Sequence, residues 1–236
     1  MLRIFRKGLQ TGVVTTAYPE KDDTPLQGFR GLPTWHQEKC LHCGKCMEKC
    51  PTKAITINKS NRLWTIDAKK CIFCGYCEDT CINNAVFLGS EFELTEEALP
   101  EPANKIFGRS VHIRHLDAGS CNGCDWEMVA LTGPVYDIQR LGFDFVASPR
   151  HADVLMVTGP VTRNLEIAAR KTFNAAPAPK LVVAVGTCAC SGGICGKSYA
   201  SSGGVNNILP VDTYIPGCPP RPQALIHGLM RAVKRL

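Results

Sequence analysis

The second half of the chain alternates short apolar runs with longer segments in which apolar residues recur every three or four positions. Runs of about five apolar residues rich in valine and isoleucine are typical of buried strands, whereas the longer periodic segments are typical of helices. The predicted strands are Val111–Leu116, Phe143–Ala147, Asp153–Val157, Lys180–Val185 and Val211–Ile215. Strands and helices that alternate in this way predict an open, largely parallel sheet.

Three helices are predicted between or after these strands. One covers residues Asp125–Leu141, a second covers Arg163–Ala175 after an N-cap at Thr162, and the last covers Pro222–Arg235, with proline in its first turn. The fold class of residues 108–236 is therefore predicted to be α/β, a flavodoxin-like open parallel sheet with helices on both faces.

An internal repeat occupies the first half of the chain. The run Cys40–Cys50 recurs as Cys71–Cys81, and each copy is followed at the same offset by a short alternating segment, Ile55–Asn58 and Val86–Leu88. Each copy predicts a cysteine loop, a short helix, a turn and a strand. Two such halves predict a small α+β domain over residues 33–95.

Two segments lie outside these units. Residues 1–32 form an N-terminal extension and docking segment, whose basic start at Leu2–Lys7 predicts either a short amphipathic helix on a membrane or membrane subunit, or a solvated terminus. Residues 96–107 are predicted to be a linker, because the segment is acidic and contains Pro100 and Pro102.

The repeated cysteines have the spacing of an iron–sulfur protein. Bacterial ferredoxins use the run CxxCxxCxxxCP, in which the fourth cysteine ligates the other 4Fe-4S cluster. The first predicted cluster is held by Cys40, Cys43, Cys46 and Cys81, and the second by Cys71, Cys74, Cys77 and Cys50. Zinc sites are a weaker interpretation, because zinc ligands normally come as two separated pairs. Cys81 is followed by isoleucine instead of proline, which affects the loop and not the ligands.

A second group of cysteines lies in the loops that follow predicted strands. Four positions are involved: Cys121 and Cys124 in GSCNGC, one cysteine of the GTCACSGGIC segment, and Cys218 in IPGCPP. The carboxyl ends of strands in an open α/β sheet meet at one edge, so these thiols are expected to converge on a third cluster. Within the GTCACSGGIC segment the candidates are Cys188, Cys190 and Cys195.

Several segments carry a family resemblance: GSCNGCDWE, SPRHADVLMVTGPVTR, GTCxxSGG and VDTYIPGCPP, over residues 108–232. They resemble the small subunit of membrane-bound, energy-converting NiFe hydrogenases, including formate hydrogenlyase. The N-terminal part, with TGVVTTAYP, GFRGLP and the double cysteine run, is similar to the two-cluster ferredoxin subunit of the same complexes. The chain therefore resembles a fusion of two neighbouring electron-transfer subunits.

The resemblance implies a role for each cysteine loop. Cys121, Cys124, Cys188 and Cys218 would bind the proximal cluster, while Cys190 and Cys195 are left over. The catalytic NiFe centre would lie in a partner large subunit, so no residue of this chain is expected to be catalytic. The chain would be a non-catalytic redox subunit that carries electrons through three 4Fe-4S clusters, from ferredoxin or a formate dehydrogenase module to the NiFe site, or in reverse.

The small subunit of complex I is homologous and serves a quinone instead of a NiFe centre. Complex I members typically place two adjacent cysteines at the start of the proximal motif, whereas Cys121 and Cys124 are separated by two residues, as in hydrogenases. A complex-I-like subunit that lacks a NiFe partner remains the alternative. Other electron-transfer subunits and membrane-arm subunits are further expected partners.

Composition limits the remaining function classes. The formal charge of +6 invites a nucleic-acid-binding interpretation, but three clusters with their thiolates would add roughly −6. No nucleic-acid partner is therefore expected. The basic N-terminus lacks a cleavage site, and dense cysteines in a reducing compartment favour metal over disulfides. The expected location is the cytoplasm, peripheral to the membrane through partner subunits.

Overall fold

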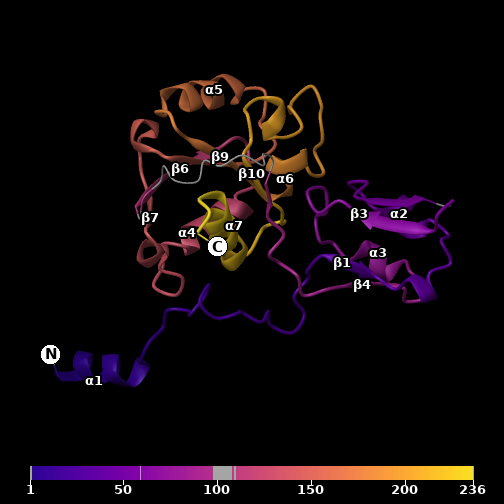
Figure 1. Cartoon of the computed structure of the whole chain (residues 1–236), viewed down its shortest axis with the longest axis horizontal. Helices are drawn as coiled ribbons and strands as arrows, with labels where there is room; N and C mark the ends of the chain where they lie inside the picture. The colour runs from indigo at the N-terminus through magenta and orange to yellow at the C-terminus, as the bar shows by residue number, and fades with distance from the viewer. Residues whose placement is uncertain (1, 59, 98–107, 109, 236) are drawn as a thin grey trace.

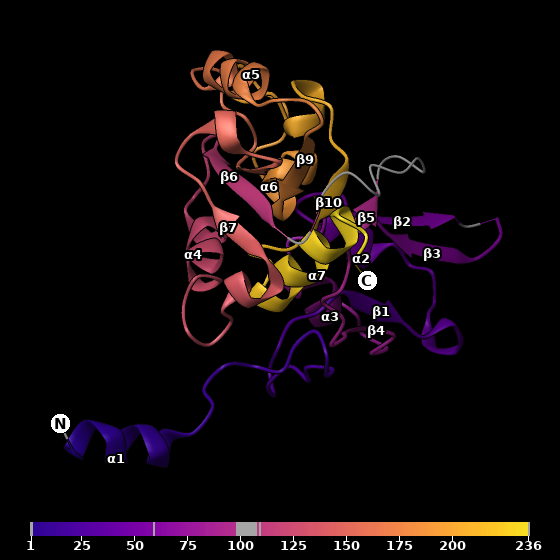
Figure 2. The same cartoon turned by 60° about the vertical axis from the view of Figure 1, so that its left-hand side comes forward.

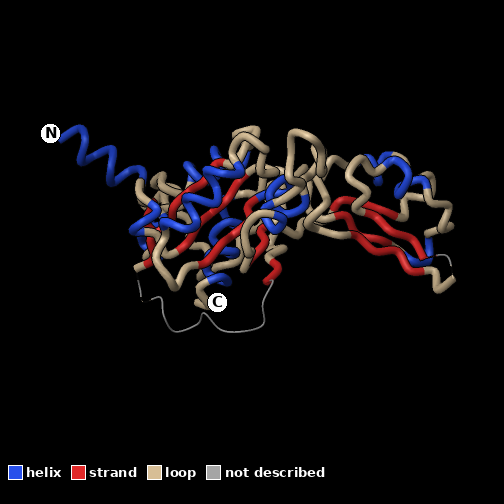
Figure 3. The backbone as a smooth tube through the Cα atoms, turned by 90° about the horizontal axis from the view of Figure 1, so that it is seen from above, coloured by secondary structure: helices blue, strands red, loops and turns tan. Residues whose placement is uncertain are grey.

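The computed structural model describes residues 2–58, 60–97, 108 and 110–235. The chain forms a larger region built on a six-stranded sheet and a smaller region beside it, and helix α1 (Leu2–Thr11) stands apart from both (Figure 1). Seen from above, the smaller region and α1 occupy opposite ends of an elongated molecule (Figure 3). Within the described residues, no helix has both the length and the apolar character needed to cross a bilayer.

The larger region, called the sheet region from β5 to α7, contains six strands in the order β5-β10-β9-β8-β6-β7. The strands are β5 (Glu96–Glu97), β6 (Val111–Asp117), β7 (Phe143–Phe145), β8 (Val154–Thr158), β9 (Leu181–Val185) and β10 (Thr213–Ile215). Strands β6 to β10 pair in parallel, and in chain order they lie as 2-1-3-4-5, which is the flavodoxin-like arrangement. All five predicted strands and the predicted fold class are confirmed.

Side chains that alternate along the central strands fill two cores, one on each face of the sheet. On β8, Val154 and Met156 point into one core, whereas Leu155 and Val157 point into the other. Every residue of β8 and β9 is buried. Because helices cover both faces, these strands consist of continuous apolar runs instead of alternating ones.

The helices of the sheet region divide between its two faces (Figures 1 and 2). They are α4 (Gly123–Ala130), α5 (Glu166–Ala175), α6 (Gly186–Ser191) and α7 (Pro222–Ala232). Met128 of α4 and Leu225 of α7 pack into one core, and Ala169 of α5 packs into the other. Short 3₁₀ helices occur at Gln37–Lys39, Ile138–Leu141, Pro149–His151 and Val205–Asn207.

Two helix predictions need correction. The predicted helix Asp125–Leu141 ends at Ala130, because the Thr132-Gly133-Pro134 sequence forms a turn; the residue before a proline disfavours helical dihedral angles. Helix α5 begins three residues later than predicted, with Leu165 at the N-cap position. The backbone NH of Thr162 donates to Ala118, so this residue ties α5 to the end of β6 instead of capping the helix.

The smaller region, called the ferredoxin-like region from β1 to β4, has the predicted repeat of loop, helix and strand. Its helices are α2 (Lys45–Lys49) and α3 (Tyr76–Asp79), which contact each other. Its strands form two antiparallel pairs, β1 (Pro33–Trp35) with β4 (Val86–Leu88), and β2 (Ile55–Asn58) with β3 (Leu63–Ile66). Ile55, Trp64 and Val86 form its small core.

The predicted linker begins inside the sheet region. Glu96 and Glu97 form β5, which pairs antiparallel with β10 at the sheet edge; residues 98–107 of the prediction lie outside the described residues. The N-terminal extension lies along the sheet region, where Thr16 donates its backbone NH to Val135 O at 2.8 Å and Tyr18 is buried. The extension after α1 is therefore bound to the body of the protein.

Packing of α7 against the sheet predicts a measurable stability loss. Leu229 is 0% exposed in the core beneath α7, so Leu229→Ala is expected to cost about 2–5 kcal/mol through lost burial and the cavity that remains. The midpoint of guanidinium unfolding, followed by far-ultraviolet circular dichroism, measures this loss. Ile167→Ala on α5, where the side chain is 67% exposed, is the control and should change stability by less than about 0.5 kcal/mol.

Candidate iron–sulfur sites

The first ferredoxin-like site is a hollow bordered by thiols from both copies of the repeat. Its cavity of about 180 Å³ is lined by Cys40, Cys43, Cys46 and Cys81, together with apolar side chains that include Ile57. Three thiols come from the loop before α2 and its first turn, and the fourth follows α3. The structure therefore brings together the four cysteines predicted by the rule that the last cysteine of each run ligates the cluster of the other run.

The second ferredoxin-like site has the complementary composition. Cys71, Cys74 and Cys77 line a smaller hollow with Cys50, which comes from the first copy of the repeat. The contact between α2 and α3 places the ends of the two runs side by side, so each helix delivers its final cysteine to the other loop.

Backbone NH groups surround these sulfurs in the same way in both copies of the repeat. His42 N lies 3.4 Å from Cys40 Sγ, and Phe73 N lies 3.4 Å from Cys71 Sγ. His42 and Phe73 both have positive φ, and each loop ends on a glycine with φ 85°, so the loops curl around the sulfur. The exchanged cysteines accept from Ala54 N at 3.3 Å and from Ala85 N at 3.2 Å. NH donors directed at sulfur stabilise thiolates.

The third site lies at the carboxyl edge of the parallel sheet. Cys121 and Cys124 follow β6, Cys188 lies in α6 directly after β9, and Cys218 follows β10. Burial, followed by the nearby thiols of Cys188, Cys121 and Cys218, raises the pKa of Cys124. The four cysteines implied by the family resemblance are thus gathered in one place. Helix α6 was not predicted, because six residues are too few for a periodic signal.

Two glycines lie in close contact with the sulfurs of the third site. At Gly186, with φ 84°, an added Cβ would collide with Cys124 Sγ, and at Gly193, with φ 56°, it would lie 2.9 Å from Cys188 Sγ. Both positive φ values and both contacts exclude an ordinary side chain. The glycines therefore let the backbone lie directly against two of the sulfurs, which a side chain at either position would displace.

The chemistry of the thiols also fits a cationic metal cluster. Burial, together with neighbouring thiols, raises the pKa of Cys71 to about 11, of Cys77 to about 12 and of Cys188 to about 11. Such thiols ionise readily only when bonded to positive charge, as iron in a cluster provides. Among the described residues, no three His, Cys, Asp or Glu side chains converge as the ligands of a single metal ion do. A bound 4Fe-4S cluster supplies reversible one-electron chemistry.

The two remaining cysteines differ in position. Cys190 is buried on the far side of α6, where its Sγ lies 3.6 Å from Ala184 O in the core. Cys195 is exposed and lies near enough to Cys188 to help raise the pKa of that thiol, after burial and Cys218. Cys190 therefore directs its sulfur toward a core backbone oxygen although it lies close enough to Cys124 for that thiol to raise its pKa further after burial, and Cys195 lies at the exposed margin of the third site.

A polar network behind the third site was missed by the sequence analysis. The Asp125 carboxylate accepts hydrogen bonds from the hydroxyls of Thr158, at 2.7 Å, and Ser120, and His115 Nε2 lies 3.0 Å from it. The network joins β6, β8 and the start of α4, and therefore fixes the loop that holds Cys121 and Cys124. Polar residues scattered over 43 positions give no pattern by which the sequence alone could have identified them.

Comparisons with known proteins match both halves of the chain. Residues 121–232 match the family "NADH ubiquinone oxidoreductase, 20 Kd subunit", and residues 39–85 match the "4Fe-4S dicluster domain". The chain is 44% identical to a probable membrane-bound hydrogenase subunit of Pyrococcus furiosus, over 56% of this chain and 79% of that protein. It is 45% identical to formate hydrogenlyase subunit 7 of Escherichia coli, over 55% of this chain but only 51% of that protein.

A quinone-linked enzyme and a solved structure are also similar. An NADH-quinone oxidoreductase subunit of Clostridium beijerinckii is 47% identical over 48% of this chain and 68% of its own length. A chain of the membrane-bound sulfane sulfur reductase, an archaeal respiratory membrane complex, is 35% identical, with a TM-score of 0.48 over 53% of this chain and 70% of that chain.

Fold, thiol sites and similarities together define an iron–sulfur electron-transfer protein. The chain belongs to the family of small subunits shared by membrane-bound hydrogenases and complex I, and it carries a dicluster ferredoxin domain fused ahead of the family's sheet domain. The family resemblance found in the sequence is confirmed at this level. The assignment of individual cysteines to three clusters stays a prediction, and it can be tested by iron content.

Changing Gly186 should affect the third site alone. Gly186→Ala forces a Cβ against Cys124 Sγ, so the anaerobically reconstituted chain is expected to lose roughly four of about twelve irons. Iron and acid-labile sulfide, measured per chain, give the count. Gly8→Ala on α1, where an added Cβ meets nothing within 4 Å, is the matched control and should keep full iron. Full iron in Gly186→Ala would contradict the assignment of Cys124.

Proposed function

We propose that this chain relays electrons through three 4Fe-4S clusters between a donor and the NiFe site of a partner large subunit. The donor is ferredoxin or a formate dehydrogenase module, and the partner reduces protons or oxidises hydrogen. The chain itself is a redox subunit: its residues bind the clusters, surround them with NH donors and hold them in sequence.

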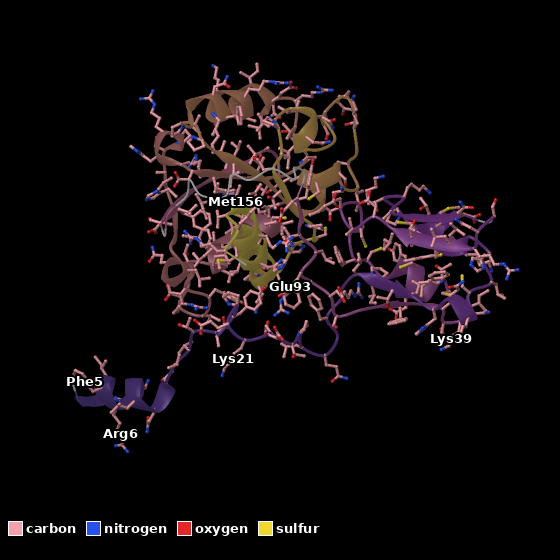
Figure 4. The ribbon with its side chains drawn as sticks, in the orientation of Figure 1. Phe5, Arg6, Lys21, Lys39, Glu93 and Met156 are labelled. Atoms are coloured by element: carbon pink, nitrogen blue, oxygen red, sulfur yellow. The ribbon has the colours of Figure 1, made fainter. Side chains whose placement is uncertain are left out.

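The proposal rests chiefly on the proximity of the second and third sites. Cys71 and Cys74 of the second site, in the ferredoxin-like region, lie near enough to Cys218 of the third site to influence thiol pKa values. Cys74 and Cys218 also line one cavity of about 330 Å³ between the two regions. Lys39, which borders the first site, lies at the end of the ferredoxin-like region that points away from the sheet region (Figure 4), so the three sites are proposed to form a series that ends at the sheet edge.

One observation favours a hydrogenase over the complex-I-like alternative. The two-residue gap between Cys121 and Cys124 follows the hydrogenase pattern. NADH-quinone oxidoreductase subunits match with an identity similar to that of the hydrogenase subunits, so a quinone-linked complex without NiFe is the second candidate.

Nickel separates the two candidates. The complex purified anaerobically through a tag on the full chain is expected to contain nickel and to evolve hydrogen from reduced viologen. An iron-rich, intact complex that contains no nickel and evolves no hydrogen would reject the hydrogenase role and favour the quinone-linked alternative.

The N-terminal helix supports a peripheral position at the cytoplasmic face of a membrane. In α1, Phe5 and Arg6 point to opposite sides (Figure 4), and helical spacing places Leu9 beside Phe5, and Arg3 and Lys7 on the side of Arg6; Phe5 and Leu9 are 72% and 86% exposed. A short helix with an apolar face and a basic face binds anionic membrane surfaces, or the membrane subunits that lie in them. Residues 1–32 are accordingly proposed as the docking segment of the complex.

Acidic side chains placed on the apolar face of α1 should weaken this attachment. The double substitution Phe5→Asp and Leu9→Asp removes apolar contact and adds negative charge, so less of the chain is expected in the membrane fraction after cell lysis. Immunoblotting of the sedimented membranes measures the fraction. Ile167→Asp, at an exposed position on α5, is the control for a surface apolar-to-acid change. Equal membrane recovery of the unmodified chain, the double variant and Ile167→Asp would contradict a docking role for α1.

A further inference from the structure

Two side-chain hydroxyls of α6 join the sheet region to the ferredoxin-like region. Thr187 Oγ1 donates to Cys71 O at 2.7 Å, and Ser191 Oγ donates to Lys69 O at 2.8 Å. Thr187 is 1% exposed, so its hydroxyl lies in a place that water does not reach. Both bonds span more than 100 residues of sequence, and both end on the loop that begins the second site.

Thr187 also occupies a special position relative to the cysteines. It directly precedes Cys188 in the chain, and its backbone NH donates to Gly217 O at 2.8 Å, beside Cys218. Its hydroxyl lies 3.1 Å from that same oxygen, which is longer than the bond to Cys71 O. One residue thus touches the backbone of a second-site cysteine, adjoins one third-site cysteine and hydrogen-bonds the neighbour of another.

We infer that the Thr187 hydroxyl is the bridge that couples the second and third sites electronically. The bonded path runs from Cys71 Sγ through the Cys71 carbonyl, across one hydrogen bond to Thr187, and through one peptide bond to Cys188 Sγ. Buried hydrogen bonds in a low-dielectric interior are well defined and polarise the groups they join. This inference rests on the proposed electron relay and adds the residue through which its last internal step passes.

The step requires no chemistry at Thr187 itself. One electron leaves the second site and one arrives at the third, while the hydroxyl keeps its proton and forms or breaks no covalent bond. The reductant is a low-potential one-electron donor added from outside. Thr187 is therefore a positioning and coupling residue, not a catalytic one.

Ser191 supplies a matched control for simple docking of the two regions. Its hydroxyl bonds to the same loop at a similar distance, but Lys69 precedes the first cysteine of the second run and Ser191 follows Cys188 by three residues. Loss of the Ser191 bond therefore loosens the same interface without removing the link between Cys71 and Cys188. A docking role predicts equal effects of the two residues, whereas a bridging role predicts an effect of Thr187 alone.

The test uses the full chain, reconstituted anaerobically with iron and sulfide and reduced by a pulse of viologen radical. Freeze-quenched electron paramagnetic resonance spectra follow the reduction of each site. Thr187→Val is expected to lose the fast phase at the third site while iron content and midpoint potentials stay unchanged. Thr187→Ser, which restores a hydroxyl, and Ser191→Ala should both retain that phase.

Three results would overturn the inference: a fast phase preserved in Thr187→Val, the same loss in Ser191→Ala, or no recovery in Thr187→Ser. If Thr187→Val holds less iron at the third site, Thr187→Ala is measured in its place under the same criteria. Failure of the hydrogenase role is a separate outcome, because it is judged by nickel in the whole complex. Electron transfer within this chain is measured without any partner.

Discussion

The structure depends on bringing four thiols together at a partly buried place, three times over. Burial, together with neighbouring thiols, raises the pKa of Cys71, Cys77, Cys124 and Cys188, so these thiols favour binding a cationic cluster over remaining ionised and empty. The pKa of Cys50 shifts in the opposite direction. Burial would raise its pKa, but hydrogen bonds from Ala54, Thr52 and Ile55 hold the pKa below its usual value. Hydrogen-bond donors around the sulfur thus stabilise the thiolate, as the positive charge of cluster iron would do further.

Two different fold solutions meet this demand. The ferredoxin-like region uses local sequence, in which a tight loop with positive φ at His42 or Phe73 presents three thiols and the facing helix returns the fourth. The sheet region uses topology, because parallel strands end at one edge and cysteines 97 residues apart, at 121 and 218, meet there. A local site tolerates changes elsewhere in the chain, whereas the third site requires that β6, β9 and β10 all keep their register.

This difference explains what could be predicted. The cysteine runs and the five parallel strands each have a strong local signal, and the sequence analysis located both. Helix α6, strands β1, β3 and β5, and the break after Ala130 have weak local signals, because each is short or set by tertiary pairing. The hydrogen bonds of Thr187, Ser191 and Asp125 join positions dozens of residues apart, so no spacing rule in the sequence identifies them.

The interface between the two fused regions fixes how they are oriented relative to each other. Electron transfer between sites depends on a fixed separation, and a covalent linker alone leaves that separation free. Here the chain leaves the ferredoxin-like region through β5, which pairs with β10, and Lys69 forms an ion pair with Glu96 while lying over the Tyr214 ring, 5.2 Å from its centroid. Exposed ion pairs of this kind add little stability by themselves. Combined with the buried hydroxyl bonds of α6 and the pairing of β5, however, they specify one orientation, in which the second site faces the third.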